Sequence, residues 1–270
     1  MEIIPLTADR CIDACVPWSD EFDALLGRLQ WHVHTPYAHA LVAHEWDDVI
    51  AVACAINHGS SGRITLMRTP ASATFASRTK EDPDALHTTL ANMLLAQLEA
   101  EGCESVSLVS APADVERWSA LGFVAHEQIM RYSGGRFLQA TRDEVINFEP
   151  FHRMGLLHLD RQASGEDRST LLMEHSYLGS VYMEGNRMRG FSLPLLGEGL
   201  IIADAPDVGL ELQRWLFPIQ QHILLPAGNL AHEHLTKQDY TATPVGVRMV
   251  RGTPLAVRTG MSFGEVWGAV

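Results

Sequence analysis

The sequence predicts an α+β protein made of two units, each a mixed, mainly antiparallel sheet flanked by helices. Two observations carry this prediction. The chain has 270 residues, which is long for one compact domain and comfortable for two. Signals for strand, helix, hairpin, strand, helix and strand also occur twice along the chain, as a repeated pattern without repeated sequence.

The first unit is predicted from apolar patterns between residues 3 and 132. Short apolar runs indicate a strand, a helix, a hairpin and another strand at 3–6, 19–29, 39–55 and 63–68. The clearest element is a long helix, whose apolar stripe recurs at spacings of three and four: Leu86, Leu90, Met93, Leu94 and Leu98. Gly102 ends this helix, and a strand at 105–109, a short helix ending at Gly122 and a strand at 128–132 follow.

The boundary between the units is predicted at residues 133–150, where a Gly-Gly turn and a mixed charged segment precede Pro150. We therefore expect domains at 1–135 and 151–270, joined by a linker at 136–150. For the second unit, the pattern predicts strands at 156–159, 200–203, 222–225 and 245–250, helices at 165–175, 208–221 and 230–238, and a hairpin at 179–193.

Composition favours a cytoplasmic protein. The formal net charge is -13, so no basic face for nucleic acid or an anionic membrane is expected. The N-terminus lacks the basic start and apolar core of a signal peptide, and no apolar run approaches the length of a membrane span. The cysteines at positions 11, 15, 54 and 103 form no paired framework, which fits a reducing compartment.

The segment from Ala85 to Phe123 resembles the GNAT superfamily of acyl-CoA N-acyltransferases. There, a long helix, a strand and a short helix closing on a Leu-Gly-Phe-like turn recur in this order, and the turn here is Leu121-Gly122-Phe123. The segments LQWHVHT and LVAHEWDDVIAVACA resemble the Trp-x-x-Thr segment and hairpin of these enzymes. Downstream, LHLDRQASGEDR and VGVRMVRG resemble a second GNAT-like unit fused behind the first in a bacterial subfamily, so two tandem GNAT-like units are expected.

The resemblance implies acetyl-CoA or another acyl-CoA as co-substrate, with its pyrophosphate on backbone amides at the start of the long helix. The superfamily's Arg/Gln-x-x-Gly-x-Gly/Ala loop aligns with the segment DPDALH at 82–87, so the signature is absent. Asp82 and Asp84 would repel a phosphate, although Asp84 is also a typical helix cap.

Two groups of residues are expected to contact the acyl-CoA. A strand N–H near Met67, Arg68 and Thr69 would polarise the acyl carbonyl. Amides at the helix start would hold the pyrophosphate, and they belong to Leu86, His87, Thr88 and Thr89. The cations nearby in sequence are Arg68, Arg78 and Lys80.

The catalytic positions depart from the superfamily's pattern. Where a Tyr on the short helix commonly protonates the leaving thiolate, this chain has Trp118, which we interpret as a packing residue because indole donates no proton at a useful pKa. In the second unit, Leu235 lies near that position, and Asn229 falls within one position of a cofactor-contacting Asn.

His32 and His34 are the candidates for the general base, since they would share one face of an extended segment. Histidines without a catalytic role are the alternative. A histidine pair at i, i+2 without a Cys or a third ligand is poor zinc spacing, so no metal is expected there or at His232 and His234.

These features predict transfer of an acetyl or other short acyl group from acyl-CoA to the primary amine of a small molecule. A catalytically silent GNAT-like module that binds a metabolite or a partner protein is the alternative, which the missing phosphate signature favours. A structural or regulatory homodimer that uses the second unit as its interface is the third possibility. Binding of coenzyme A separates the first possibility from the other two.

Overall fold

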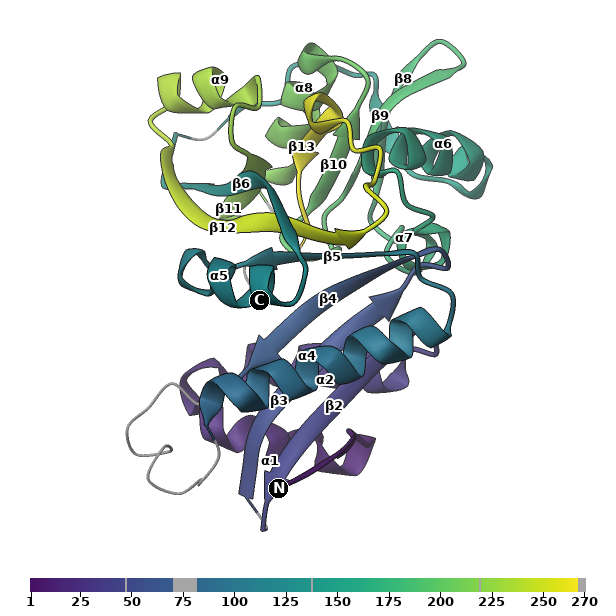
Figure 1. Ribbon diagram of the computed structural model, residues 1–270. Coiled ribbons are helices and arrows are strands. Elements are labelled where there is room, and N and C mark those ends of the chain that lie inside the picture. The colour runs from purple at the N-terminus through teal and green to yellow at the C-terminus, as the bar shows by residue number, and fades with distance from the viewer. Residues whose placement is uncertain (47, 70–81, 137, 219, 267–270) are drawn as a thin grey trace.

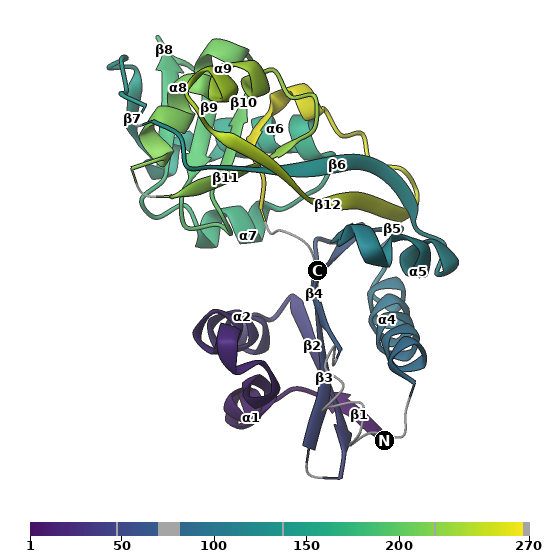
Figure 2. The same ribbon diagram turned by 90° about the vertical axis from the view of Figure 1, so that its left-hand side faces the viewer.

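Figures 1 and 2 show the computed structural model, which contains two sheets flanked by helices, one mixed sheet of eight strands and one antiparallel sheet of five strands in the order β13-β10-β9-β8-β7. The structure describes residues 1–46, 48–69, 82–136, 138–218 and 220–266. The chain is an α+β protein, as the sequence predicted. None of the helices formed by the described residues is both long and apolar enough to cross a membrane. We call the chain up to strand β6 the first unit and the chain from strand β7 the second unit.

The first unit contains the strands and helices β1 (Glu2–Pro5), α1 (Cys11–Cys15), α2 (Phe22–His34), β2 (Ala38–Glu45), β3 (Asp48–Asn57), β4 (Ser61–Arg68), α4 (Pro83–Ala100), β5 (Ser105–Ser110), α5 (Val115–Ala120) and β6 (Val124–Ser133). The second unit contains β7 (Val145–Asn147), α6 (Arg153–Ser164), α7 (Ser169–Glu174), β8 (Ser180–Glu184), β9 (Arg187–Leu193), β10 (Leu200–Ala203), α8 (Pro206–Leu216), β11 (His222–Pro226), α9 (Ala231–Lys237), β12 (Thr241–Gly252) and β13 (Ser262–Gly264). Short 3₁₀ helices at Ala8–Arg10, Val16–Glu21, Pro112–Asp114, Pro150–His152 and Thr259–Met261 join several of these elements.

Helices cover both faces of the first unit's sheet, as Figure 2 shows. The leucine stripe of α4 packs against the face of β3 that carries Ala51, Ala53 and Ala55. On the other face, α1 and α2 pack against Val52 and Cys54. This division follows from the alternation of side chains along a strand, since β3 is buried on both faces. The sequence predicted the β2–β3 hairpin and the leucine stripe of α4, and both are confirmed. Met93, which was expected in the same stripe, is exposed, so that part of the prediction is wrong.

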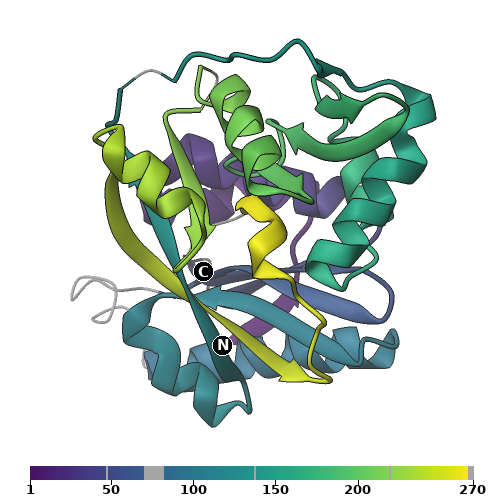
Figure 3. The same ribbon diagram turned by 90° about the horizontal axis from the view of Figure 1, so that it is seen from above.

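The two units share one sheet. Its eight strands lie in the order β1-β2-β3-β4-β5-β12-β6-β11. Strand β12 of the second unit pairs antiparallel with β5 on one side and with β6 on the other. Figures 1 and 3 show β12 (yellow-green) running beside β6 (teal) across the junction of the units. The last long strand of the second unit therefore completes the sheet of the first.

Strands β4 and β5 are parallel and pair only near their starts. The paired residues are Ser61 with Ser105, Gly62 with Val106 and Arg63 with Ser107. Beyond Arg63, β4 continues along β3 to Arg68, while β5 continues along β12 to Ser110. The two strands therefore diverge toward their carboxyl ends, and the gap between them lies on the side where α4 begins.

The corresponding gap in the second unit is filled by β13. This strand pairs antiparallel with β10, and the N–H of Glu265 just beyond it donates to the carbonyl of Leu224 in β11, at 2.9 Å. Phe263 of β13 is fully buried and packs on Gly209 of α8, where a Cβ atom would lie 2.2 Å from the ring. The sequence pattern did not predict β13, because a three-residue strand carries almost no periodicity.

Two predictions of secondary structure are wrong. Residues 156–159 form part of helix α6, not a strand, because Leu156, Leu159 and Ala163 are the buried face of a helix. A four-residue apolar run does not distinguish the two structures without its neighbours. Residues 29–34, expected to be extended, belong to α2, which continues to His34.

Two glycine variants test the packing of β13. Gly27 and Gly209 both lie within helices, but a Cβ at Gly27 would meet no atom within 4 Å. We expect Gly27→Ala to raise the free energy of unfolding by about 0.5–1 kcal/mol, the usual gain in a helix. Gly209→Ala should lower it by about 1–3 kcal/mol, because the new methyl group displaces Phe263. Urea unfolding measures both, and a stabilised Gly209→Ala variant would contradict this packing.

Candidate active site between the two units

A β-bulge interrupts β4 directly after its last pair with β5. Cys54 of β3 pairs with Leu66, and Ala55 pairs with Ile64, so Thr65 is the extra residue on β4. Two side chains of α2 hold this bulge. Nε2 of His32 lies 2.7 Å from Oγ1 of Thr65, and Nη2 of Arg28 donates to the Thr65 carbonyl.

The hydrogen bonds of His32 fix its tautomer. Its Nδ1 lies 2.7 Å from the carbonyl oxygen of Arg28, and a carbonyl only accepts, so Nδ1 carries the proton of the neutral ring. Nε2 then accepts a hydrogen bond from the hydroxyl of Thr65. Burial lowers the pKa of His32 to about 4. The ring is 2% exposed, and both of its nitrogens serve to hold the bulge.

The structure does not bring His32 and His34 onto one face, so that part of the prediction is wrong. Both lie in the last turns of α2, where residues two apart point in different directions. His34 is exposed, and its Nδ1 lies 2.7 Å from the carbonyl oxygen of Gln30. A role as general base stays a prediction for either residue.

Helix α4 begins three residues before its apolar stripe, at Pro83. Asp82 caps it, since its Oδ1 accepts from the N–H of Asp84 at 3.2 Å. The N–H of Leu86 donates to the Asp82 carbonyl at 2.9 Å. The amides from Leu86 to Thr89, predicted to hold the pyrophosphate, therefore belong to the regular hydrogen-bond ladder of the helix. The hydroxyl of Thr89 also donates within the helix, to the Ala85 carbonyl at 2.8 Å.

Arg117 of α5 is a cation beside the α4 start that the sequence analysis missed. It forms ion pairs with Asp84 and, at 3.0 Å, with Asp114. The next residue, Trp118, holds Arg117 in this position. The Trp118 ring packs edge-on against the His87 ring of α4, with 4.6 Å between the ring centroids. Trp118 is 1% exposed, which confirms it as a packing residue.

The other predicted cofactor residues are placed as follows. Met67 is buried in the core beneath α4, and Thr69 directly follows β4. Arg68 pairs with Glu21 at 2.9 Å, so its charge is directed away from α4. Arg78 and Lys80 lie outside the described residues. Burial, assisted by Arg117, lowers the pKa of His87 to about 4.

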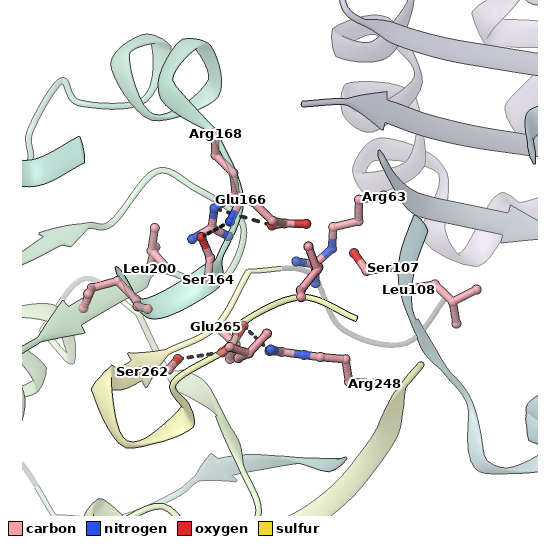
Figure 4. A pocket seen from close by; sticks show the side chains of 14 residues that line it. Arg63, Ser107, Leu108, Ser164, Glu166, Arg168, Leu200, Arg248, Ser262 and Glu265 are labelled. Atoms are coloured by element: carbon pink, nitrogen blue, oxygen red, sulfur yellow. Dashed lines mark hydrogen bonds and ion pairs between the residues drawn. The ribbon is translucent and has the colours of Figure 1, made fainter. Parts of the chain in front are cut away.

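A cavity of about 30 Å³, lined by both aliphatic and charged side chains, lies between the units at the point where β4 and β5 diverge (Figure 4). A space of this size has room for one or two water molecules. Its polar lining comes from both units: Arg63 of β4, Ser107 of β5, Arg248 of β12, Ser164 of α6, Glu166 and Arg168 of the segment before α7, Ser262 of β13, and Glu265. We call this space the junction cavity.

Most charges around the junction cavity are paired. Arg168 binds Asp160 through both nitrogens of its fork. Arg248 contacts Glu265 at 2.8 Å and Glu127 at 3.1 Å. Burial alone would raise the pKa of Glu265, but Arg248 holds it below its usual value. The pKa of Asp160 stays above its usual value because burial outweighs Arg168.

Arg63 and Glu166 face the cavity from opposite units, as Figure 4 shows. Nη2 of Arg63 donates to the carbonyl of Val266 at 3.0 Å, and burial lowers the pKa of Arg63 to about 10. Glu166 is 5% exposed. Among the described residues, its Oε1 has no hydrogen-bond partner, and its Oε2 lies 3.8 Å from Nε of Arg168.

Comparisons with known proteins identify the architecture. No family model and no curated protein sequence matches the chain. A solved structure described as a "putative acetyltransferase" from Pyrococcus horikoshii superposes on 98% of this chain and 94% of its own, with a TM-score of 0.82 and 17% sequence identity. The tandem GNAT protein from the clavulanic acid biosynthesis pathway superposes on 94% of this chain and 99% of its own, with a TM-score of 0.55 and 9% identity. This chain has the tandem GNAT fold.

The two GNAT-like units differ at the same position. In the first, β4 and β5 leave a gap; in the second, β13 lies between β10 and β11. Asn229, which aligned near a cofactor-contacting Asn, holds this strand, because its Nδ2 donates to the carbonyl of Ser262 at 2.5 Å. Leu235 is fully buried. The side chain of Asn229 therefore holds β13 in the gap of the second unit.

Replacing Asp84 tests the charge at the α4 start of this GNAT fold. We expect Asp84→Asn to strengthen acetyl-CoA binding by about 3- to 10-fold, because it removes a negative charge and frees Arg117 for the phosphates. Glu116→Gln removes an exposed charge from α5 and should leave the affinity within about twofold. Calorimetric titration measures both affinities. Weaker binding by a folded Asp84→Asn variant would refute the placement of the pyrophosphate at the start of α4.

The burial of His32 predicts a pH dependence of stability. The folded pKa is about 4, below the ordinary value of about 6.5. Between these values the unfolded chain binds a proton that folded His32 does not, so stability is lost as the pH falls from about 6.5 to about 4. We expect His32→Gln to reduce the slope of unfolding free energy against pH in this window by up to about 1.4 kcal/mol per pH unit. His34→Gln, which changes an exposed residue, should leave the slope unchanged, and equal slopes in all three proteins would show that His32 is not buried neutral.

Proposed function

We propose that this protein is an acyl-CoA N-acyltransferase that binds one acyl-CoA per chain, in the first unit. It transfers an acetyl or other short acyl group to the primary amine of a small molecule. The observation that carries this proposal is the divergence of β4 and β5 after the Arg63–Ser107 pair, beside the start of α4. A gap between parallel strands gives an extended pantetheine chain backbone donors and acceptors on both sides.

The residues at the gap fit an acyl-CoA to different degrees. The bulge at Thr65 removes one residue of β4 from the regular ladder with β3, which supports a contact between strand backbone and ligand. The dipole of α4 and the cation Arg117 favour a pyrophosphate. Asp82 and Asp84 oppose it. We therefore expect weaker binding than a glycine-rich phosphate loop would give.

The reaction forms an amide C–N bond and breaks the thioester C–S bond. The acceptor enters as an ammonium ion, which loses one proton to solvent before its lone pair can attack. A second proton leaves the nitrogen and goes to the departing thiolate. The products are the amide and the thiol of coenzyme A. Because Trp118 cannot supply a proton, the thiolate takes its proton from the amine or from water.

The structure of the second unit supports a stoichiometry of one acyl-CoA per chain. Its equivalent gap holds β13, and Phe263 and Asn229 anchor that strand on both sides. An acyl-CoA could enter there only if β13 left the sheet. The second unit contributes instead one wall of the junction cavity, which includes Glu166, Arg168 and Glu265.

Hydrogen exchange with an internal control tests the proposal. Calorimetric titration with acetyl-CoA should give about one site per chain. Bound acetyl-CoA should slow amide exchange in β4 from Thr65 to Arg68 and at the end of β5, because these backbones lie beside the gap. The matching strands β10 and β11 should exchange at an unchanged rate. Protection of β10 and β11 instead, or two sites per chain, would refute the assignment.

A catalytically silent module is the second candidate, and the acidic start of α4 favours it. Asp82 and Asp84 stand where the superfamily has its phosphate loop. Absence of any acetyl-CoA binding at millimolar concentration would support this candidate over the enzyme.

A further inference from the structure

Glu166 is the carboxylate of the junction cavity whose hydrogen-bonding capacity is unused. Its side chain is 4% exposed. Asp160 and Glu265 accept short contacts from Arg168, Arg248 and Ser262. By contrast, Oε1 of Glu166 has no hydrogen-bond partner among the described residues, and Oε2 lies 3.8 Å from Nε of Arg168, beyond hydrogen-bond distance. A buried carboxylate in this state favours a further donor or cation.

The charges around the cavity also leave room for one cation. The cavity is lined by the guanidinium groups of Arg63, Arg168 and Arg248 and by the carboxylates of Glu166 and Glu265. Two further carboxylates lie behind this lining, since Asp160 pairs with Arg168 and Glu127 pairs with Arg248. His58 adds no charge at neutral pH, because burial, with Arg168 and Arg63 nearby, lowers its pKa to about 3. Counted with these two partners, the described cluster has three cationic and four acidic side chains, one acid more than it has cations, in a setting where little solvent screens the charges.

The position and size of the cavity select the cation. Arg63 and Ser107, which line the cavity, are the last paired residues before the β4–β5 gap. A group bound in the cavity would lie next to the place proposed for the thioester. About 30 Å³ admits a primary ammonium group, which is similar in size to water, but not a quaternary ammonium.

We infer that Glu166 binds the primary ammonium group of the acyl acceptor in the junction cavity. This inference rests on the proposed function and adds to it the residue that recognises the acceptor. The acceptor carries a positively charged, unbranched primary amine, and the second unit recognises it. Glu166 acts by holding the ammonium beside the thioester, so its removal should weaken acceptor binding and leave acyl-CoA binding intact.

The test uses methylammonium chloride as the probe and thermal unfolding as the readout. Methylammonium at 100 mM should raise the Tm of the wild-type protein by about 2 °C or more over sodium chloride at equal ionic strength. Tetramethylammonium should not, because it neither fits the cavity nor donates a hydrogen bond. Glu166→Gln, which keeps the shape and removes the charge, should lose the methylammonium effect.

Two further variants separate binding from folding. Asp167→Asn removes the neighbouring charge, which pairs with Arg161 outside the junction cavity, and it should keep the wild-type response. Glu166→Asp keeps the charge and should keep part of it. If Glu166→Gln does not fold, a response in Glu166→Asp that is smaller than in the wild type, with the full response retained in Asp167→Asn, would carry the same conclusion, and a full response in Glu166→Asp would contradict it.

Kinetics give an independent readout. With acetyl-CoA and a panel of methylamine, ethanolamine and putrescine, release of the coenzyme A thiol measures turnover. Glu166→Gln should raise KM for the amine by about 30-fold or more, with little change in the Kd for acetyl-CoA. An unchanged KM, or a wild-type protein that binds acetyl-CoA but does not respond to methylammonium, would overturn the role of Glu166. A protein that does not bind acetyl-CoA would overturn the proposed function itself.

Discussion

The insertion of β12 between β5 and β6 is the constraint on which the rest of the structure depends. Strand β5 is hydrogen-bonded to β12 along its whole length, from Ser105 to Ser110, so β12 sets its direction. That direction carries β5 away from β4 after three paired residues. Without β12, both β5 and β6 would have an unpaired edge inside the first unit, which is costly for a buried strand. The gap in the first unit is therefore a property of the whole chain.

The charged junction follows from the same insertion. Because β12 crosses between the units, Arg248 reaches both Glu127 of the first unit's β6 and Glu265 beyond β13. Burying charges is expensive unless each has a partner, and these partners come from different units. The two units thus cannot separate without exposing or unpairing the cluster. Such coupling keeps the walls of the junction cavity at a fixed position relative to the β4–β5 gap.

Elements with a strong local pattern could be predicted from the sequence, and those fixed by distant contacts could not. The leucine stripe of α4 and the β8–β9 hairpin each contain their own signal within one segment. Nothing local shows that β12 leaves its own unit, or that three residues near the end form β13. The same holds for Glu166, whose significance arises only when the segment between α6 and α7 lines the same cavity as Arg63 of β4. The reverse error occurred at His32. Its place in a motif-like segment suggested a catalytic base, but the structure shows a buried ring with both nitrogens hydrogen-bonded.

One stretch of chain makes the two units unequal. Strand β12 ends at Gly252, which has a φ of +90° and no room for a Cβ, since that atom would lie 2.2 Å from the carbonyl oxygen of Glu104. The chain then returns to the second unit and forms β13. A single segment thus helps to open one gap and closes the other. In a tandem fold whose units are alike in pattern, this asymmetry is the physical basis of our proposal that the first unit binds the co-substrate and the second forms the wall that recognises the acceptor.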